Sequence, residues 1–198
     1  RSIKRIPAER LVQYAVENGA VAVASSYNEP LITSEWAVEI FKLAKENGLK
    51  TVYVSNGYAS PQVLDYLAPW LDGYKVDLKS MREEEYRKMG GGLQPVLDTI
   101  RRVHDLGLWV EVVTLVIPGM NDSSDELWET GRFLTSVSRD IPWHVTAYHP
   151  DYKEDAPPTP AETLKRAAEI GQEAGLRYVY AGNLPSRVGS LEDTLCPQ

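Results

Sequence analysis

Apolar positions along the chain follow two alternating periods, which predict a regular series of strands and helices. Runs of β-branched and aromatic residues begin directly after Gly19, Gly48, Gly107 and Gly175. A glycine just past a helix takes the left-handed conformation that closes it, and the residues that follow here favour extended structure. We therefore predict strands over about 20–26, 50–56, 73–79, 108–117, 143–149 and 176–182.

The segments between these strands have helical periodicity. Ala37, Ile40, Phe41 and Ala44 have the i, i+3, i+4, i+7 spacing, which recurs over 93–100 and 164–171. Ser60-Pro61, Ser123 with Glu126, and Thr159-Pro160 have the patterns of helix N-caps. Strands that alternate with helices predict an α/β fold with a parallel sheet and right-handed crossovers. We expect a single domain over 1–198, with an irregular tail over about 184–198.

Composition narrows the class of protein. A length of 198 residues suits one domain, and a net charge of −7 argues against a nucleic-acid or anionic-membrane surface. No apolar run approaches the roughly 20 residues of a spanning helix. A single cysteine excludes an internal disulfide framework and favours a cytoplasmic location. Because the chain opens with Arg1 and soon enters a helix pattern, we expect a fragment or processed product without its N-terminal portion.

Short polar clusters follow the first three predicted strands. They are Asn28-Glu29-Pro30, Ser55-Asn56-Gly57 and Asp77-Leu78-Lys79. The carboxyl ends of parallel strands meet at one edge of a sheet or barrel, where such folds build their sites. Glu29 could accept hydrogen bonds from an ammonium group, and the alternation of a strand puts Asp77 and Lys79 on one face. Simple turns, and a structural ion pair between Asp77 and Lys79, would explain the same residues.

Two later strands add further candidates. Val116 and Ile117 precede a Pro-Gly turn and could form an apolar wall for a flat ring. His144 and His149 have odd separation, so a regular strand would place them on opposite faces. We expect His149, at the strand end, to belong to the site, and His144 to be a hydrogen-bonded packing residue. The sequence has no HExxH, GxGxxG, GKS/T or GxSxG motif.

In this order, the clusters resemble the radical S-adenosylmethionine (SAM) superfamily, and within it the activating enzymes of the pyruvate formate-lyase type. The radical SAM enzyme of the AmmeMemoRadiSam system is a similar member of that group. The stretches that carry the resemblance are 27–30, 76–79, 93–100, 109–119, 142–145, 149–152 and 177–183. The resemblance implies a partial (β/α)6 barrel, related to the TIM barrel, which here would lack its first strand.

The resemblance also implies a site that binds SAM. Asn28 and Glu29 would hold the amino group of SAM. The SAM carboxylate and ribose would lie by Ser55, with its neighbour Asn56, and by Asp77 and Lys79. His149 would lie near the ribose, and Val116 and Ile117 near the adenine. The whole enzyme would use a [4Fe–4S] cluster to generate a 5′-deoxyadenosyl radical, which abstracts hydrogen from a protein or small-molecule substrate.

The chain departs from the family pattern in its cysteines. It has no CxxxCxxC motif, and Cys196 alone cannot ligate a four-iron cluster through thiolates. We therefore expect no metal ligands and no cluster in this chain, and no radical chemistry from it alone. A second departure is Val54, where some relatives carry an acid before the Ser-Asn-Gly turn.

Other functions are open from the sequence. One is a β/α-barrel lyase or aldolase with Lys79 as Schiff-base nucleophile and Asp77 or Glu111 as acid/base. Another is a non-catalytic binding module.

The edge of strand 20–26 should be exposed in a partial barrel, and exposed edges invite pairing. We expect either a second copy of the chain, giving a homo-oligomer, or the tail after Asn183 to cover that edge.

Overall fold

Strands and helices alternate along the chain in the predicted order. The computed structural model describes residues 5–194. Its strands are β1 (Ala22–Ser25), β2 (Lys50–Ser55), β3 (Gly73–Asp77), β4 (Trp109–Val116), β5 (Trp143–Ala147) and β6 (Val179–Gly182). Its α-helices are α1 (Ala8–Glu17), α2 (Ser34–Glu46), α3 (Pro61–Leu67), α4 (Glu83–Lys88), α5 (Leu93–Asp105), α6 (Ser124–Val137) and α7 (Ala161–Glu173). Three short 3-10 helices complete it: η1 (Pro30–Thr33), η2 (Ala68–Trp70) and η3 (Gly189–Glu192).

The six strands form one parallel sheet in the order β1-β2-β3-β4-β5-β6. Sequential order with a crossover between neighbours is the topology of a (β/α) barrel. The glycines that precede β2, β4 and β6 have positive φ, as closing glycines should: 73° at Gly48, 75° at Gly107 and 105° at Gly175. The prediction of an α/β fold with a partial barrel is therefore confirmed.

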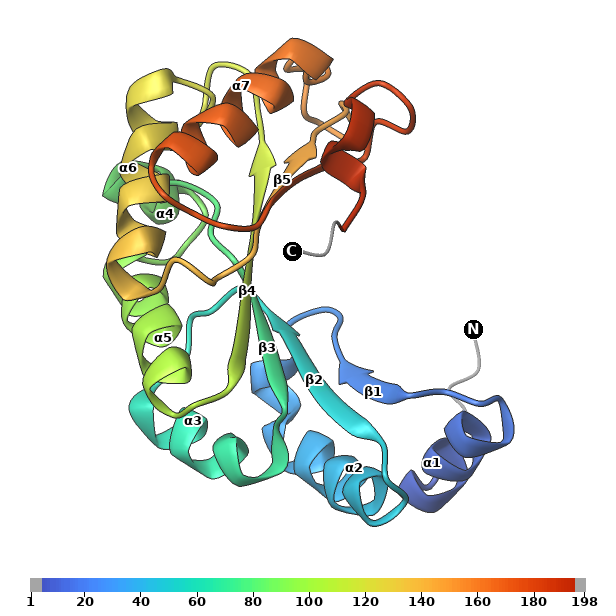
Figure 1. Cartoon of the computed structure of the whole chain (residues 1–198). Helices are drawn as coiled ribbons and strands as arrows, with labels where there is room; N and C mark the ends of the chain where they lie inside the picture. Colours follow the sequence, from blue (N-terminus) through green and yellow to red (C-terminus); the bar gives the residue numbers. More distant parts are fainter. Residues whose placement is uncertain (1–4, 195–198) are drawn as a thin grey trace.

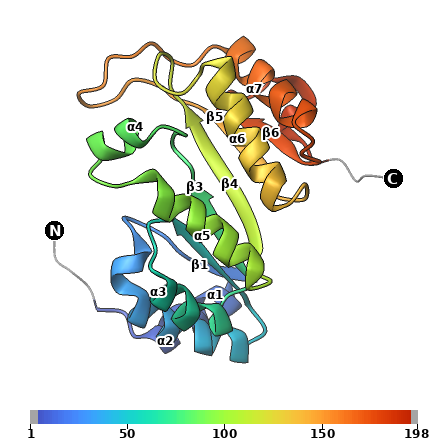
Figure 2. The same cartoon turned by 90° about the vertical axis from the view of Figure 1, so that its left-hand side faces the viewer.

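The sheet is curved, and the helices lie on its convex side (Figure 1). In the view from that side, α5 and α6 lie in front of the central strands (Figure 2). The core fills the space between these helices and the sheet. Its largest fully buried side chains include Trp143, Tyr53, Tyr74 and Phe41. The indole Nε1–H of Trp143 donates to Thr114 Oγ1 at 3.0 Å, so the polar end of this buried ring is satisfied.

The concave side of the sheet is open, and the alternation along each strand decides which side chains face it. In β4, Val110, Val112, Thr114 and Val116 are buried, whereas Trp109, Glu111, Val113 and Leu115 are partly or well exposed. The register continues this surface across the sheet, because Lys75 of β3 pairs with Glu111, and Val113 pairs with His144 of β5. The concave face therefore carries charged and aromatic side chains.

Two of the three predicted N-caps form as expected. Ser60 Oγ accepts from the backbone N–H of Val63 at the start of α3, and Ser123 Oγ accepts from that of Glu126 at the start of α6. Thr159 does not cap α7. Its hydroxyl instead donates to the carbonyl of Val116 at 2.5 Å and accepts from the N–H of Tyr148 at 2.9 Å. Thr159 thus ties together the ends of β4 and β5.

The two edges of the sheet differ. Residues of η3 pack against β6, so the described part of the tail lies on that side of the sheet. The expectation that the tail covers β1 is therefore wrong for residues 184–194, and within residues 5–194 β1 pairs with β2 alone. No helix in this range is long and apolar enough to cross a membrane.

Candidate functional site

The carboxylate of Glu29 joins the ends of β1 and β2. Its Oε1 accepts from the backbone N–H of Leu31 at 3.1 Å and from Ser55 Oγ at 2.8 Å. Its Oε2 accepts from the backbone N–H of Asn56 at 2.7 Å. Pro30 follows directly, holds Glu29 in extended conformation and begins η1. The predicted clusters at these two strand ends therefore meet in space.

The turn after β2 is fixed by its own side chains. Ser55 Oγ accepts from the N–H of Gly57 at 3.0 Å, and Asn56 Oδ1 accepts from the N–H of Tyr58 at 2.9 Å. Gly57 has a φ of 74°, the left-handed conformation that the Asn-Gly pair predicts. Asn28, before Glu29, is exposed. The carboxyl end of β2 therefore carries a fixed turn next to the hydrogen-bonded carboxylate of Glu29.

Asp77 at the end of β3 lies between two lysines. Its Oδ2 is 3.4 Å from Lys79 Nζ, and its Oδ1 pairs with Lys75 Nζ. The sequence predicted the pair of Asp77 and Lys79 but missed Lys75, although the same two-residue period places it on this face. Because Glu111 of β4 also lies beside Lys75, Lys79 is a cation at the strand end that can attract an anionic group.

The end of β4 is arranged differently from the prediction. The side chain of Val116 is fully buried, because it faces the helices, and it offers no open wall. Leu115, its neighbour, is instead exposed on the concave side, with 39% of its surface accessible. Ile117 is half-buried at the start of the turn. The expectation for Val116 is corrected here: strand alternation turns this residue away from the open face.

Asn121 organises the turn after β4 and was missed as a site-building residue. It is buried, with 2% of its surface exposed. Its Oδ1 accepts from the N–H of Ile117 at 2.7 Å, and its Nδ2 donates to the carbonyls of Lys79 at 2.7 Å and Leu115 at 2.9 Å. The sequence signal was an Asn just past a Pro-Gly turn. Asn121 holds the ends of β3 and β4 at a fixed separation.

The two histidines lie in different settings, because β5 ends at Ala147, between them. His149 follows the end of β5 and is exposed, and its Nδ1 lies 3.2 Å from the carbonyl of Pro150. Its role at the site stays a prediction. His144 is hydrogen-bonded as expected, but it faces the open side of the sheet, where its Nε2 lies 3.0 Å from Glu111 Oε2.

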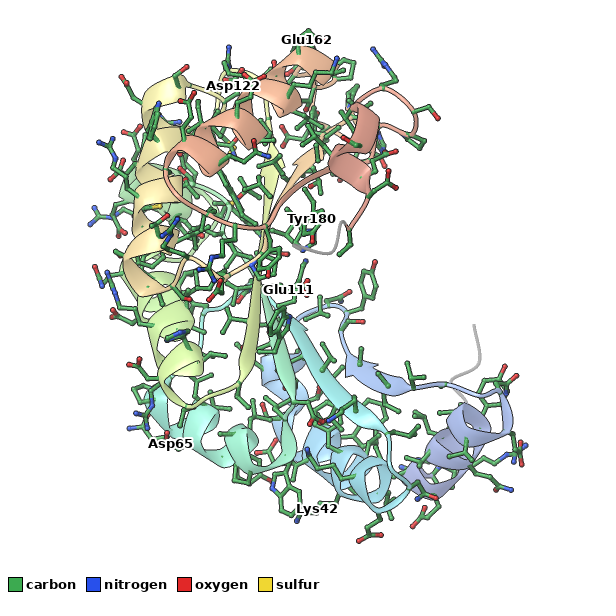
Figure 3. All side chains as sticks on the ribbon, viewed as in Figure 1. Lys42, Asp65, Glu111, Asp122, Glu162 and Tyr180 are labelled. Atoms are coloured by element: carbon green, nitrogen blue, oxygen red, sulfur yellow. The ribbon has the colours of Figure 1, made fainter. Side chains whose placement is uncertain are left out.

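A second cluster surrounds Glu111 on the concave face. Trp109 Nε1–H donates to Glu111 Oε1 at 2.8 Å, and the ring of Tyr180 stacks on His144 with centroids 5.0 Å apart. The hydrogen bond from His144, followed by that from Trp109, holds the pKa of Glu111 below its ordinary value although burial opposes this. Figure 3 labels Glu111 and Tyr180, which both lie on the concave side of the sheet.

The residues present fit SAM better than they fit an iron–sulfur cluster. SAM carries an ammonium and a carboxylate, and the strand ends offer the carboxylate of Glu29 and the ammonium group of Lys79. By contrast, a thiolate-held [4Fe–4S] cluster needs several cysteines, and the chain has one, Cys196, which lies outside the described residues. Within residues 5–194, no group of three or more His, Cys, Asp or Glu is placed to hold a metal ion.

Comparison with known proteins gives the family. Residues 5–134 match the model of the radical SAM superfamily. This chain belongs to the radical SAM superfamily. The radical SAM chain is 36% identical over 191 residues to protein MJ0808 of Methanocaldococcus jannaschii, covering 96% of the chain and 56% of that protein. It is 24% identical over 173 residues to the pyruvate formate-lyase 1-activating enzyme of Escherichia coli K12, covering 80% of the chain and 70% of the enzyme.

The fold agrees with this assignment. A domain of a pyruvate formate-lyase-activating enzyme from Bacteroides vulgatus superposes with a TM-score of 0.72 at 22% identity, over 81% of this chain and 98% of that domain. The resemblance to activating enzymes is therefore confirmed in sequence and in fold. Because the chain spans little more than half the length of MJ0808, the activity and partners of a whole protein are matters for proposal.

Proposed function

We propose that this chain is the SAM-binding core of a radical SAM enzyme of the activating type. The observation that carries the proposal is that Glu29 is bonded to Asn56 at the end of β2, while Asp77 and Lys79 pair at the end of β3, the neighbouring strand. Opposite charges at neighbouring strand ends can bind both ends of an amino acid. The superfamily uses SAM together with a [4Fe–4S] cluster, and the family match supports both cofactors for the whole enzyme.

Glu29 is proposed to hold the SAM ammonium group. Its Oε2 accepts one hydrogen bond in the structure, from Asn56, and a carboxylate oxygen can accept two. Asn28 lies next to it at the exposed edge, while Ser55 keeps the carboxylate in place. Because Glu29 is anchored by three hydrogen bonds before SAM arrives, little side-chain entropy is lost on binding.

Lys79 is proposed to bind the SAM carboxylate, with Asp77 holding its ammonium group in place and reaching the ribose. The ribose would lie by His149 and the adenine by Ile117, with Val116 forming part of the buried support beneath. A Schiff-base nucleophile needs a neutral amine, whereas Lys79 is in an ion pair. This geometry favours SAM binding over the lyase or aldolase alternative.

The cluster is proposed to be held by cysteines outside these 198 residues, since the chain has a single cysteine. When bound, a cluster of this superfamily supplies the electron that cleaves SAM to a 5′-deoxyadenosyl radical. We propose that the radical abstracts hydrogen from a protein or small-molecule substrate, and that the present chain does not catalyse this step alone. We propose that the whole enzyme is soluble and located in the cytoplasm.

Calorimetric titration of the 198-residue chain with SAM tests the proposal. Lys79→Ala should weaken SAM binding by about 1.5–3 kcal/mol, the range for a hydrogen bond between charged groups. Lys42→Ala is the matched control, because Lys42 lies over the ring of Trp70 on the outer side of α2 (Figure 3) and should not affect SAM. Unchanged SAM affinity in Lys79→Ala, or a borohydride-trapped adduct at Lys79, would refute the proposal.

A further inference from the structure

The cluster on the concave face forms a cavity of its own. Trp109 and Glu111 of β4, His144 of β5, and Tyr178 and Tyr180 beside and within β6 line a space of about 620 Å³. Glu192 of η3 closes part of its rim. None of the residues proposed to hold SAM lines this cavity. It is therefore a second candidate site, and one that the motifs of the sequence did not indicate.

Glu111 fixes which nitrogen of His144 carries the proton. Glu111 accepts the hydrogen bond of the Trp109 indole at Oε1, and a glutamate with an ordinary or lowered pKa is ionised at neutral pH, so Glu111 is a carboxylate with no proton to donate. The proton in the bond between His144 Nε2 and Glu111 Oε2 must then belong to His144. In a neutral imidazole the other nitrogen, Nδ1, carries the lone pair.

The lone pair on Nδ1 has no hydrogen-bond partner within residues 5–194. The ring itself is held on two sides, by Glu111 through Nε2 and by Tyr180 through stacking at an interplanar angle of 21°. His144 is therefore an oriented acceptor on the wall of a cavity to which Trp109, Tyr178 and Tyr180 contribute aromatic rings. The charged groups around this cavity include Glu111, with Lys75 beside it on β3, and Glu192 at the rim.

We propose that this cavity binds a flat molecule that carries an N–H or O–H donor, and that His144 accepts from that donor through Nδ1. Glu111 is the positioning residue. If the proton is transferred, the N–H or O–H bond of the ligand breaks, its electron pair stays on the ligand, and a new Nδ1–H bond forms. Glu111 then balances the positive charge of the imidazolium. The two carboxylates around the cavity disfavour an anionic ligand.

Nitrogen-15 NMR of the imidazole rings tests the role of Glu111 directly. The chain has three histidines, so a His144→Gln variant assigns the signals of His144. In the wild-type chain the neutral ring should carry its proton on Nε2. In Glu111→Gln the indole of Trp109, which only donates, should take the amide oxygen and leave the amide NH₂ facing His144. Nε2 must then accept, and the proton should move to Nδ1.

Glu162→Gln is the matched control, because Glu162 is a surface carboxylate of α7 that pairs with Lys165 (Figure 3). It should leave the His144 signals unchanged. A wild-type ring protonated on Nδ1, or a Glu111→Gln ring with the wild-type tautomer, would overturn the proposal. Near-ultraviolet circular dichroism confirms that each variant keeps its packing, and Trp109→Phe, which leaves the bond between Glu111 and His144 in place, should keep the wild-type tautomer.

Binding of phenol and anisole tests the class of ligand. The two have the same flat ring, but only phenol has a donor. We expect the wild-type chain to bind phenol about three- to tenfold more tightly than anisole, the effect of one neutral hydrogen bond. The preference should vanish in Glu111→Gln and in His144→Phe, and persist in Glu162→Gln. Equal affinities in the wild type, or a preference kept in His144→Phe, would overturn the proposal. No SAM is present, so this outcome is independent of the proposed function.

Discussion

Gly57 shows how a single residue constrains the candidate site. It closes the turn that positions Ser55 and Asn56, and its φ of 74° is one that side chains with a Cβ rarely adopt. A Cβ at this position would also lie 2.6 Å from a methyl carbon of Val76 and 3.2 Å from one of Val96. Backbone conformation and close packing therefore both require glycine here.

Replacing Gly57 by alanine should destabilise the chain more than replacing Gly48. Gly48 has nearly the same φ, 73°, but a Cβ there would meet no other atom within 4 Å, so Gly48→Ala should cost only about 1–2 kcal/mol of backbone strain. Gly57→Ala adds a clash, for about 2–5 kcal/mol in all. Urea unfolding of both variants measures the difference, and equal losses would show that Val76 gives way freely.

At the scale of elements, Asp72 links a helix to two strands. The residue lies just before β3. Its Oδ2 accepts from the backbone N–H of Thr51 in β2 at 2.9 Å and from Lys45 of α2 at 3.1 Å, and its Oδ1 lies 3.3 Å from Lys50. Burial would raise the pKa of Asp72, but these hydrogen bonds together lower it to about 2 from 3.8. The folded state therefore stabilises the ionised form of the Asp72 side chain.

This shift predicts an acid-sensitive contribution to stability. The pKa of Asp72 is lower in the folded than in the unfolded state, so its contribution is complete above about pH 4 and is lost as the pH falls towards 2. Because the carboxylate is partly exposed, we expect on the order of 1–2 kcal/mol. Urea unfolding between pH 7 and 2 should show that Asp72→Asn removes this part of the pH dependence.

Asp65→Asn provides the comparison for Asp72. Asp65 forms an exposed ion pair with Arg102 at 2.6 Å, and such pairs contribute little to stability (Figure 3). The plot of unfolding free energy against pH for Asp65→Asn should therefore run nearly parallel to that of the wild type. If Asp72→Asn behaved in the same way, the hydrogen bonds of Asp72 would not be coupled to folding.

At the scale of the whole molecule, β1 is an edge strand of the sheet, with a strand partner on one side. Within residues 5–194, β1 bonds to β2 alone, and the described tail packs against β6 at the other edge. Exposed apolar residues lie around β1, among them Val21, with 81% of its surface exposed, and Tyr27, with 91%. Edges of this kind pair readily with other strands.

We expect the 198-residue chain to self-associate through the edge of β1. Light scattering behind a size-exclusion column should show an apparent mass that rises with concentration towards twice that of the monomer. Ala24→Lys, which puts a charge on this exposed strand, should weaken the association by about tenfold. A mass that stays monomeric at all concentrations, or association that Ala24→Lys does not change, would show that this edge is not the contact.

The sequence by itself determined the order and type of the elements. Helical periodicity, closing glycines and β-branched runs are local signals, and each depends on a few neighbouring residues. They predicted the parallel α/β fold, and the position of polar residues after strands predicted that Glu29, Ser55 and Asp77 would share one edge. These predictions succeeded because parallel strands bring their carboxyl ends together in every barrel of this topology.

Only the tertiary structure decided which side chains face each other. The two-residue period gives relative faces within a strand, but not which face is concave, nor the register between strands. This is why Val116 proved to be turned towards the helices, and why the contact of Glu111 with His144 was not predicted. Glu111 and His144 lie 33 residues apart, and they meet because hydrogen bonding between β4 and β5 fixes one register out of several that the sequence pattern allows.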